Sequence, residues 1–87
     1  MRLRFNAKER DLIQDLTLDE SGVARALEST EPISGVYEVE CSLDDLDHLM
    51  NSIAADANHA DNPKKETALD GLFERLGRIQ DKYDDAL

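Results

Sequence analysis

The chain has 87 residues, and 20 Asp and Glu against 10 Lys and Arg give it a net charge of −10. This length fits a single small domain, residues 1–87, and the acidic surplus argues against direct nucleic-acid binding, which needs excess Lys and Arg. We expect no membrane span and no secretory signal, because no long apolar run is present, and the single cysteine, Cys41, predicts a cytoplasmic protein without an internal disulfide.

The chain opens with the pattern of a strand followed by a helix. Residues 2–5 alternate polar and apolar side chains, which predicts a short strand with both apolar side chains on one face. Asn6 and Glu9 then have the spacing of a capping box, in which each side chain accepts a hydrogen bond from the other residue's backbone. A helix is therefore expected over residues 7–16.

A second helix is predicted directly after the first. Thr17 and Glu20 repeat the capping-box spacing, and a helix over residues 18–28 would bury Leu18 and the apolar residues that follow it. Gly22 disfavours this helix by about 1 kcal/mol, because glycine loses more backbone freedom than other residues when it enters a helix.

The middle of the chain predicts a second strand over residues 36–41. Tyr37, Val39 and Cys41 alternate with two glutamates, so the three apolar side chains share one face of the strand. The glutamates point the other way, which indicates a face or an edge in contact with water.

Two longer helices are predicted in the second half of the chain. Ser42, followed by two aspartates, opens a helix over residues 43–59, where acidic side chains suit the positive end of the helix dipole. Pro63 favours the first turn of a last helix over residues 63–83, because its missing N–H would have no partner there. The break between these helices is short, which predicts an antiparallel hairpin. Its second helix presents an apolar stripe: Leu69, Leu72, Phe73, Leu76, Ile79 and Tyr83.

These elements together predict an α+β domain of order β-α-α-β-α-α, with a two-stranded sheet and a C-terminal antiparallel helical hairpin. The direction in which the strands pair stays open. A right-handed crossover of both helices over one face would make the strands parallel, whereas helices that wrap back would make them antiparallel.

No pattern of residues in the sequence predicts catalysis, a cofactor or a metal. His48 and His59 each follow an aspartate at i+3, a spacing that suits metal ligands, but a helical wheel points both histidines away from the apolar stripe. The carboxylates gather at a helix start and at the end of the sequence, where they are solvated, and Cys41 is expected to be a small buried apolar residue. We therefore predict a protein that is not an enzyme.

Without a predicted catalytic, cofactor or metal site, we expect the protein to function through contacts with other proteins. The strand over residues 36–41 offers an edge, the end of the third helix offers a polar pair, and the last helix has separated bands of acids and bases. The residues predicted to take part are Tyr37, Val39, Asn58, His59, Arg75 and Arg78.

Part of the sequence resembles short bacterial proteins of unknown function. The resemblance covers Ile-Ala-Ala-Asp-Ala-Asn-His at residues 53–59, Lys-Lys at 64–65 and Leu-Asp-Gly-Leu-Phe-Glu-Arg-Leu at 69–76. It implies a bacterial cytoplasmic protein and no activity. It also marks Asn58 and His59 as a recognition element, and the alternative is that both simply cap the helix.

The sequence as a whole favours a small, acidic, non-enzymatic protein-interaction module. Its partner is expected to be another protein or a second copy of the chain, in which case the module is a homodimer. The alternative hypothesis is an acidic inhibitor, or antitoxin-like decoy, of a nucleic-acid-binding protein, because a compact chain of charge −10 presents the same sign of charge as nucleic acid.

Overall fold

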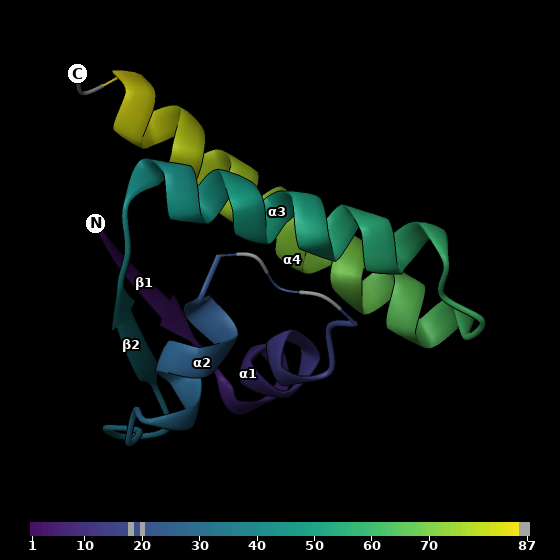
Figure 1. The fold of residues 1–87 in the computed structure, drawn as a ribbon, viewed down its shortest axis with the longest axis horizontal. Coiled ribbons are helices and arrows are strands. Elements are labelled where there is room, and N and C mark those ends of the chain that lie inside the picture. The colour runs from purple at the N-terminus through teal and green to yellow at the C-terminus, as the bar shows by residue number, and fades with distance from the viewer. Residues whose placement is uncertain (18, 20, 86–87) are drawn as a thin grey trace.

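A computed structural model of the chain describes residues 1–17, 19 and 21–85. The two-stranded sheet and the helices packed beside it confirm the predicted α+β class and element order. Figure 1 shows the long helical hairpin along one side, with the sheet and the two short helices on the other. In chain order the elements are β1 (Arg2–Phe5), α1 (Ala7–Gln14), α2 (Val23–Glu28), β2 (Tyr37–Glu40), α3 (Leu43–Asn58) and α4 (Pro63–Asp85).

The two strands pair antiparallel, which settles the direction that the sequence left open. Leu3 lies opposite Val39 in the register. Before β1 and after β2, the backbones of Met1 and Cys41 exchange two hydrogen bonds of 2.8 and 2.9 Å. The antiparallel direction follows because α1 and α2 wrap back beside the sheet and return the chain to the end of β1, as Figure 1 shows.

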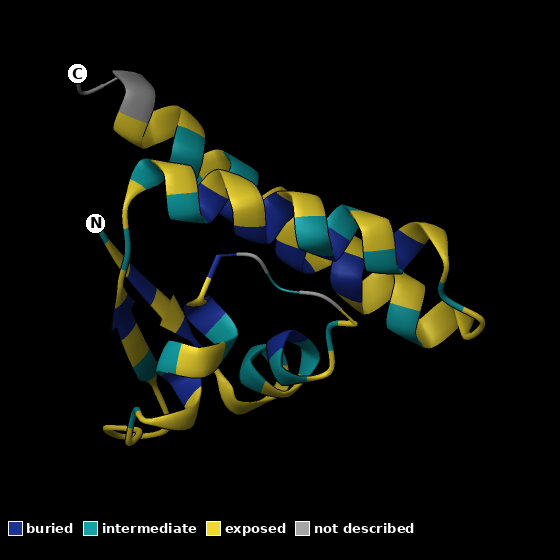
Figure 2. Ribbon diagram, in the orientation of Figure 1, coloured by how far each residue is buried: buried dark blue, intermediate teal, exposed yellow. Residues whose placement is uncertain are grey.

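The apolar core lies between the sheet, the short helices and the α3–α4 hairpin. Figure 2 shows the buried residues where these elements face one another. Both apolar residues of β1 are buried, as their alternation predicted. The largest fully buried side chains come from every helix and from β1: Phe5, Leu3, Ile13, Leu27, Leu46, Leu49, Ile53, Leu69, Leu76 and Val23.

The predicted helix over residues 18–28 is shorter than expected, because α2 begins only at Val23. Gly22 precedes it with φ +78°, a left-handed conformation that the interior of a helix does not accommodate. The carboxylate of Asp19 accepts a hydrogen bond from the backbone N–H of Ala24, and the hydroxyl of Ser21 accepts one from the N–H of Val23. Side-chain oxygens therefore take the place of a further helical turn.

The predicted helix over residues 7–16 is also shorter, because α1 ends at Gln14. Thr17, predicted to start the second helix, instead donates its backbone N–H to the Asp56 carboxylate on α3 at 3.1 Å. The predicted capping partner Glu20 and the predicted core residue Leu18 lie outside the described residues.

The helical hairpin forms where the sequence predicted it, with one difference in burial. The three leucines of the α4 stripe are buried and Ile79 is half-buried, but Phe73 is 36% exposed and Tyr83 is 40% exposed. Because α4 has 23 residues and α3 has 16, the end of α4 that carries Tyr83 extends past the start of α3, as Figure 1 shows.

Replacing Ser42 with alanine is expected to lower the free energy of unfolding by about 1 kcal/mol. The Ser42 hydroxyl accepts a hydrogen bond from the backbone N–H of Asp45, and the Asp45 carboxylate accepts one from the N–H of Ser42, which completes a capping box at the start of α3. Urea denaturation followed by circular dichroism measures the change. The matched control is Ser52→Ala inside the same helix, where the hydroxyl only donates to the carbonyl of His48, and this variant should lose no stability.

Candidate functional site

A tight turn precedes β2 and leaves apolar side chains in solvent. Ile33 and Val36 exchange two backbone hydrogen bonds of 2.9 and 3.0 Å, which close a two-residue turn. Ser34 at φ +53° and Gly35 at φ +79° are both left-handed, the combination that favours a tight hairpin turn. Ile33 is 79% exposed on this turn. The predicted strand over residues 36–41 is correspondingly shorter, because Val36 belongs to the turn.

The edge of β2 that faces away from β1 carries backbone groups without partners. Antiparallel pairs alternate between bonded and non-bonded, and Met1 with Cys41 is a bonded pair. The backbones of Glu38 and Glu40 therefore point away from β1. Among the described residues, no group forms a hydrogen bond with these outward N–H and C=O groups. Figure 1 shows β2 at the margin of the molecule, as an open edge requires.

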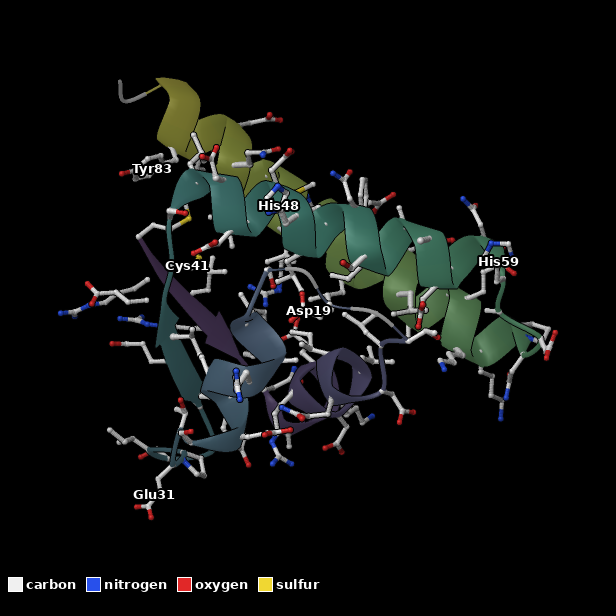
Figure 3. The ribbon with its side chains drawn as sticks, viewed as in Figure 1. Asp19, Glu31, Cys41, His48, His59 and Tyr83 are labelled. Atoms are coloured by element: carbon white, nitrogen blue, oxygen red, sulfur yellow. The ribbon has the colours of Figure 1, made fainter. Side chains whose placement is uncertain are left out.

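A hollow of about 520 Å³ lies beside this edge. If the pairing of Ile33 with Val36 continued, Glu31 would lie opposite Glu38, and the like charges disfavour that pairing. The chain diverges instead, and the hollow is lined by Arg4, Thr30, Glu31, Ile33, Val36 and Glu38. We call this hollow, together with the outward backbone of Glu38 and Glu40, the β2 docking edge. Glu31 marks its lower end in Figure 3.

On the opposite edge of the sheet, a side chain of α4 binds one of the outward backbone groups of β1. The guanidinium of Arg75 donates to the backbone carbonyl of Arg4 at 2.9 Å, on the side of β1 away from β2. It also donates to the Glu9 carboxylate at 2.7 Å, and its carbon lies 5.6 Å from the centre of the Phe5 ring. Arg75 was predicted to contact a partner, and in the structure its side chain is engaged within the chain. The contacts of Arg75 with Arg4 and Glu9 could not be predicted from the spacing of residues along one helix.

The outer face of the sheet pairs bases of β1 with acids of β2. Arg2 and Arg4 lie 3.6 and 3.2 Å from the Glu38 carboxylate. Within the part of the chain that the structure describes, Glu40 and Glu31 have no Lys or Arg nitrogen within 4.0 Å. The β2 docking edge therefore keeps a surplus of negative charge.

The structure does not bring the other predicted contact residues together. Val39, which was predicted to take part in a contact surface, is 5% exposed and belongs to the core. Tyr37 is half-buried, with the Arg10 guanidinium 5.3 Å from the centre of its ring. Asn58 and His59 are exposed at the end of α3, and Figure 3 places His59 far from Glu31.

Arg78 is exposed on α4 and lies 3.8 Å from Glu74, with which it forms an i, i+4 pair. Ile33 is an exposed apolar residue that sequence reasoning did not single out. Its signal is the dipeptide Ser34-Gly35 between two apolar residues, a pattern typical of a tight turn that leaves its flanks exposed.

A second hollow, of about 480 Å³, lies along the outer face of α3. Both histidines of the chain line it, and both are exposed, as the helical wheel predicted. Across the described ranges, no group of three His, Cys, Asp or Glu side chains is placed to hold a metal ion. The lining is otherwise mainly polar: Thr17, His48, Asn51, Ser52, Ala55, Asp56 and His59.

Cys41 is half-buried rather than fully buried at the end of β2. Burial raises the pKa of its thiol above the ordinary value, Asp45 raises it as well, and the N-terminal ammonium opposes them. We expect a disulfide reagent to label the folded chain more slowly at neutral pH than the urea-unfolded chain, because the thiolate is the reactive form. Equal rates would contradict this.

The same shift of pKa predicts how stability depends on pH. Because the folded chain favours the protonated Cys41 thiol, this contribution is full below the ordinary thiol pKa. It is lost as the pH rises through the raised folded value. The free energy of unfolding should therefore fall in alkaline solution, and Cys41→Ala should show a smaller fall when both are measured by urea denaturation.

The chain matches no protein-family model, no curated protein and no solved structure. None of the helices within the described residues is long and apolar enough to cross a membrane.

Proposed function

We propose that this protein is a non-enzymatic interaction module that binds an extended segment of another protein along the β2 docking edge. The observation that carries this proposal is the unpaired outward backbone of β2 beside a hollow with exposed apolar side chains. The outward backbone groups of Glu38 and Glu40 have no partner among the described residues, whereas Arg75 binds the outward carbonyl of Arg4. We also propose that the protein acts in the cytoplasm, where its single cysteine stays reduced.

Strand addition suits this edge for two physical reasons. An added strand forms main-chain hydrogen bonds with the free N–H and C=O groups, which supply affinity. Its side chains alternate between the two faces, so one of them can enter the hollow and cover the exposed apolar atoms of Ile33 and Val36.

A different protein fits this edge better than a second copy of the chain. If two copies paired through β2 about a two-fold axis, Glu38 would lie opposite either itself or Glu40 of the partner copy. Like charges in directly opposite positions destabilise such a pair. The homodimer predicted from the sequence therefore becomes an outcome of the experiment below.

Photo-cross-linking in a bacterial lysate tests the proposal. A photoreactive amino acid replaces Ile33 beside the hollow, and in a control it replaces Asp70, an exposed residue of α4. The decisive variant is Glu38→Pro, which removes an outward N–H while the ladder bonds to β1 remain. Glu38→Ala is its matched control, since it removes the same carboxylate but keeps the N–H. Circular dichroism confirms that each variant is folded.

The expected result is a cross-linked protein at position 33 that Glu38→Pro abolishes and Glu38→Ala retains. A product of twice the mass of the chain would show a homodimer and overturn the proposal that the partner is a different protein. Cross-linking that is unaffected by Glu38→Pro overturns strand addition. If DNA also competes for that partner, the acidic decoy becomes the better explanation.

A further inference from the structure

Resting on this proposed function, we infer that the partner segment is basic: an extended stretch in which Lys or Arg alternates with apolar residues. The carboxylates of the β2 docking edge select it by charge, and its apolar residues continue the inner face of the sheet. The inference goes beyond strand addition, because strand addition alone accepts a segment of any charge.

The chain already pairs β2 with a strand of this kind. β1 reads Arg-Leu-Arg-Phe, and the register sets its two arginines opposite Glu40 and Glu38. On the outer face both arginines form ion pairs with Glu38, while the apolar residues of β1 are buried on the inner face. The same alternation on the other edge of β2 would place bases beside the same two glutamates.

Negative charge remains for a second set of bases to neutralise. Glu38 is shared by two arginines and its side chain is still 41% exposed. Glu40 and Glu31 are exposed, and neither forms an ion pair or a side-chain hydrogen bond within the described part of the chain. Lys and Arg side chains on the outer face of an added strand reach these carboxylates, since opposite charges on neighbouring strands attract.

The inner face of the added strand requires apolar side chains. They would lie beside Tyr37 and Cys41, which are half-buried at the border of the core. A second copy of the chain does not offer its own basic strand for this purpose. Its β1 is already paired with β2, and its outward carbonyl at Arg4 is bound by Arg75.

Titration of the full chain, labelled with nitrogen-15, tests the inference with three synthetic peptides. Valine alternates with lysine in the first, with serine in the second and with glutamate in the third. We expect the lysine peptide to shift the amide signals of Ile33, Glu38 and Glu40, and to bind about tenfold more tightly than the serine peptide. The glutamate peptide should not bind, and added salt should weaken the lysine peptide most.

Two double variants, each of which replaces two acids by neutral amides, distinguish the effect of the edge carboxylates from the effect of the net charge. Glu31→Gln combined with Glu40→Gln should reduce binding of the lysine peptide severalfold and leave the serine peptide unchanged. The matched control is Glu66→Gln combined with Asp70→Asn, which removes the same charge from exposed positions on α4. It should leave binding of both peptides unchanged. Equal losses in the two double variants would overturn selection by the edge carboxylates.

Failure of the inference and failure of the proposed function give different results. If all three peptides shift the edge amides with equal affinity, the basic partner is overturned while strand addition stands. If no peptide shifts them, and Glu38→Pro has no effect on cross-linking, strand addition is itself overturned.

Discussion

Replacing Leu46 with alanine is expected to lower the free energy of unfolding by about 3 kcal/mol, within the range for buried leucines. Leu46 is 0% exposed in the core between α3 and the rest of the chain. The smaller side chain loses its transfer free energy and leaves a cavity that the surrounding side chains fill only in part. A domain of 87 residues has little stability in reserve, so a large fraction of the variant should be unfolded near 37 °C.

Urea denaturation followed by circular dichroism measures this loss. The control is Ile33→Ala, which removes an aliphatic side chain of the same size from a position that is 79% exposed. It should change stability by less than about 0.5 kcal/mol. A loss below about 1 kcal/mol in Leu46→Ala would show that α3 does not pack as described.

Replacing Arg75 with alanine is expected to destabilise the chain by about 1–2 kcal/mol and to make it self-associate. The variant loses a charge-assisted hydrogen bond to Glu9 and a bond to the carbonyl of Arg4. The figure is modest because the Arg75 side chain is 35% exposed and water screens part of its ion pair.

Self-association is expected because the variant has two open sheet edges of opposite charge. The edge of β1 carries arginines and the edge of β2 carries glutamates, so β1 of one copy suits β2 of the next. Such head-to-tail pairing presents the same two edges after every addition and does not close, so it yields growing assemblies.

Sedimentation velocity over a range of concentrations measures this effect against the unchanged chain. The control is Arg78→Ala, one turn away on the same helix, where the side chain is 75% exposed and lies 3.8 Å from Glu74. It removes the same charge from α4 and should change neither mass nor stability measurably. If Arg75→Ala sediments like Arg78→Ala, Arg75 does not prevent other copies of the chain from pairing along β1.

Most of the helical architecture was predictable, because its signals act over a few residues. Asn6 with Glu9, and Ser42 with Asp45, form the capping boxes that begin α1 and α3. Pro63 begins α4, as its missing N–H predicted. The apolar periodicity of these segments also identified which faces enter the core.

Two predictions about helices failed in different ways. The helix expected from residue 18 begins at Val23, because Gly22 turns left-handed and Asp19 and Ser21 bind the first free N–H groups. Phe73 belongs to the apolar stripe of α4 yet remains 36% exposed.

The sequence by itself determined the order of the elements, their caps and the faces that enter the core, because these depend on neighbours within one or two turns. Only the tertiary structure decided which outward backbone groups of the sheet are bound. Arg75 reaches a carbonyl 71 residues away in the chain, and this contact exists only once α4 has packed beside β1. The outward groups of Glu38 and Glu40 stay free because no described segment packs against them in the same way.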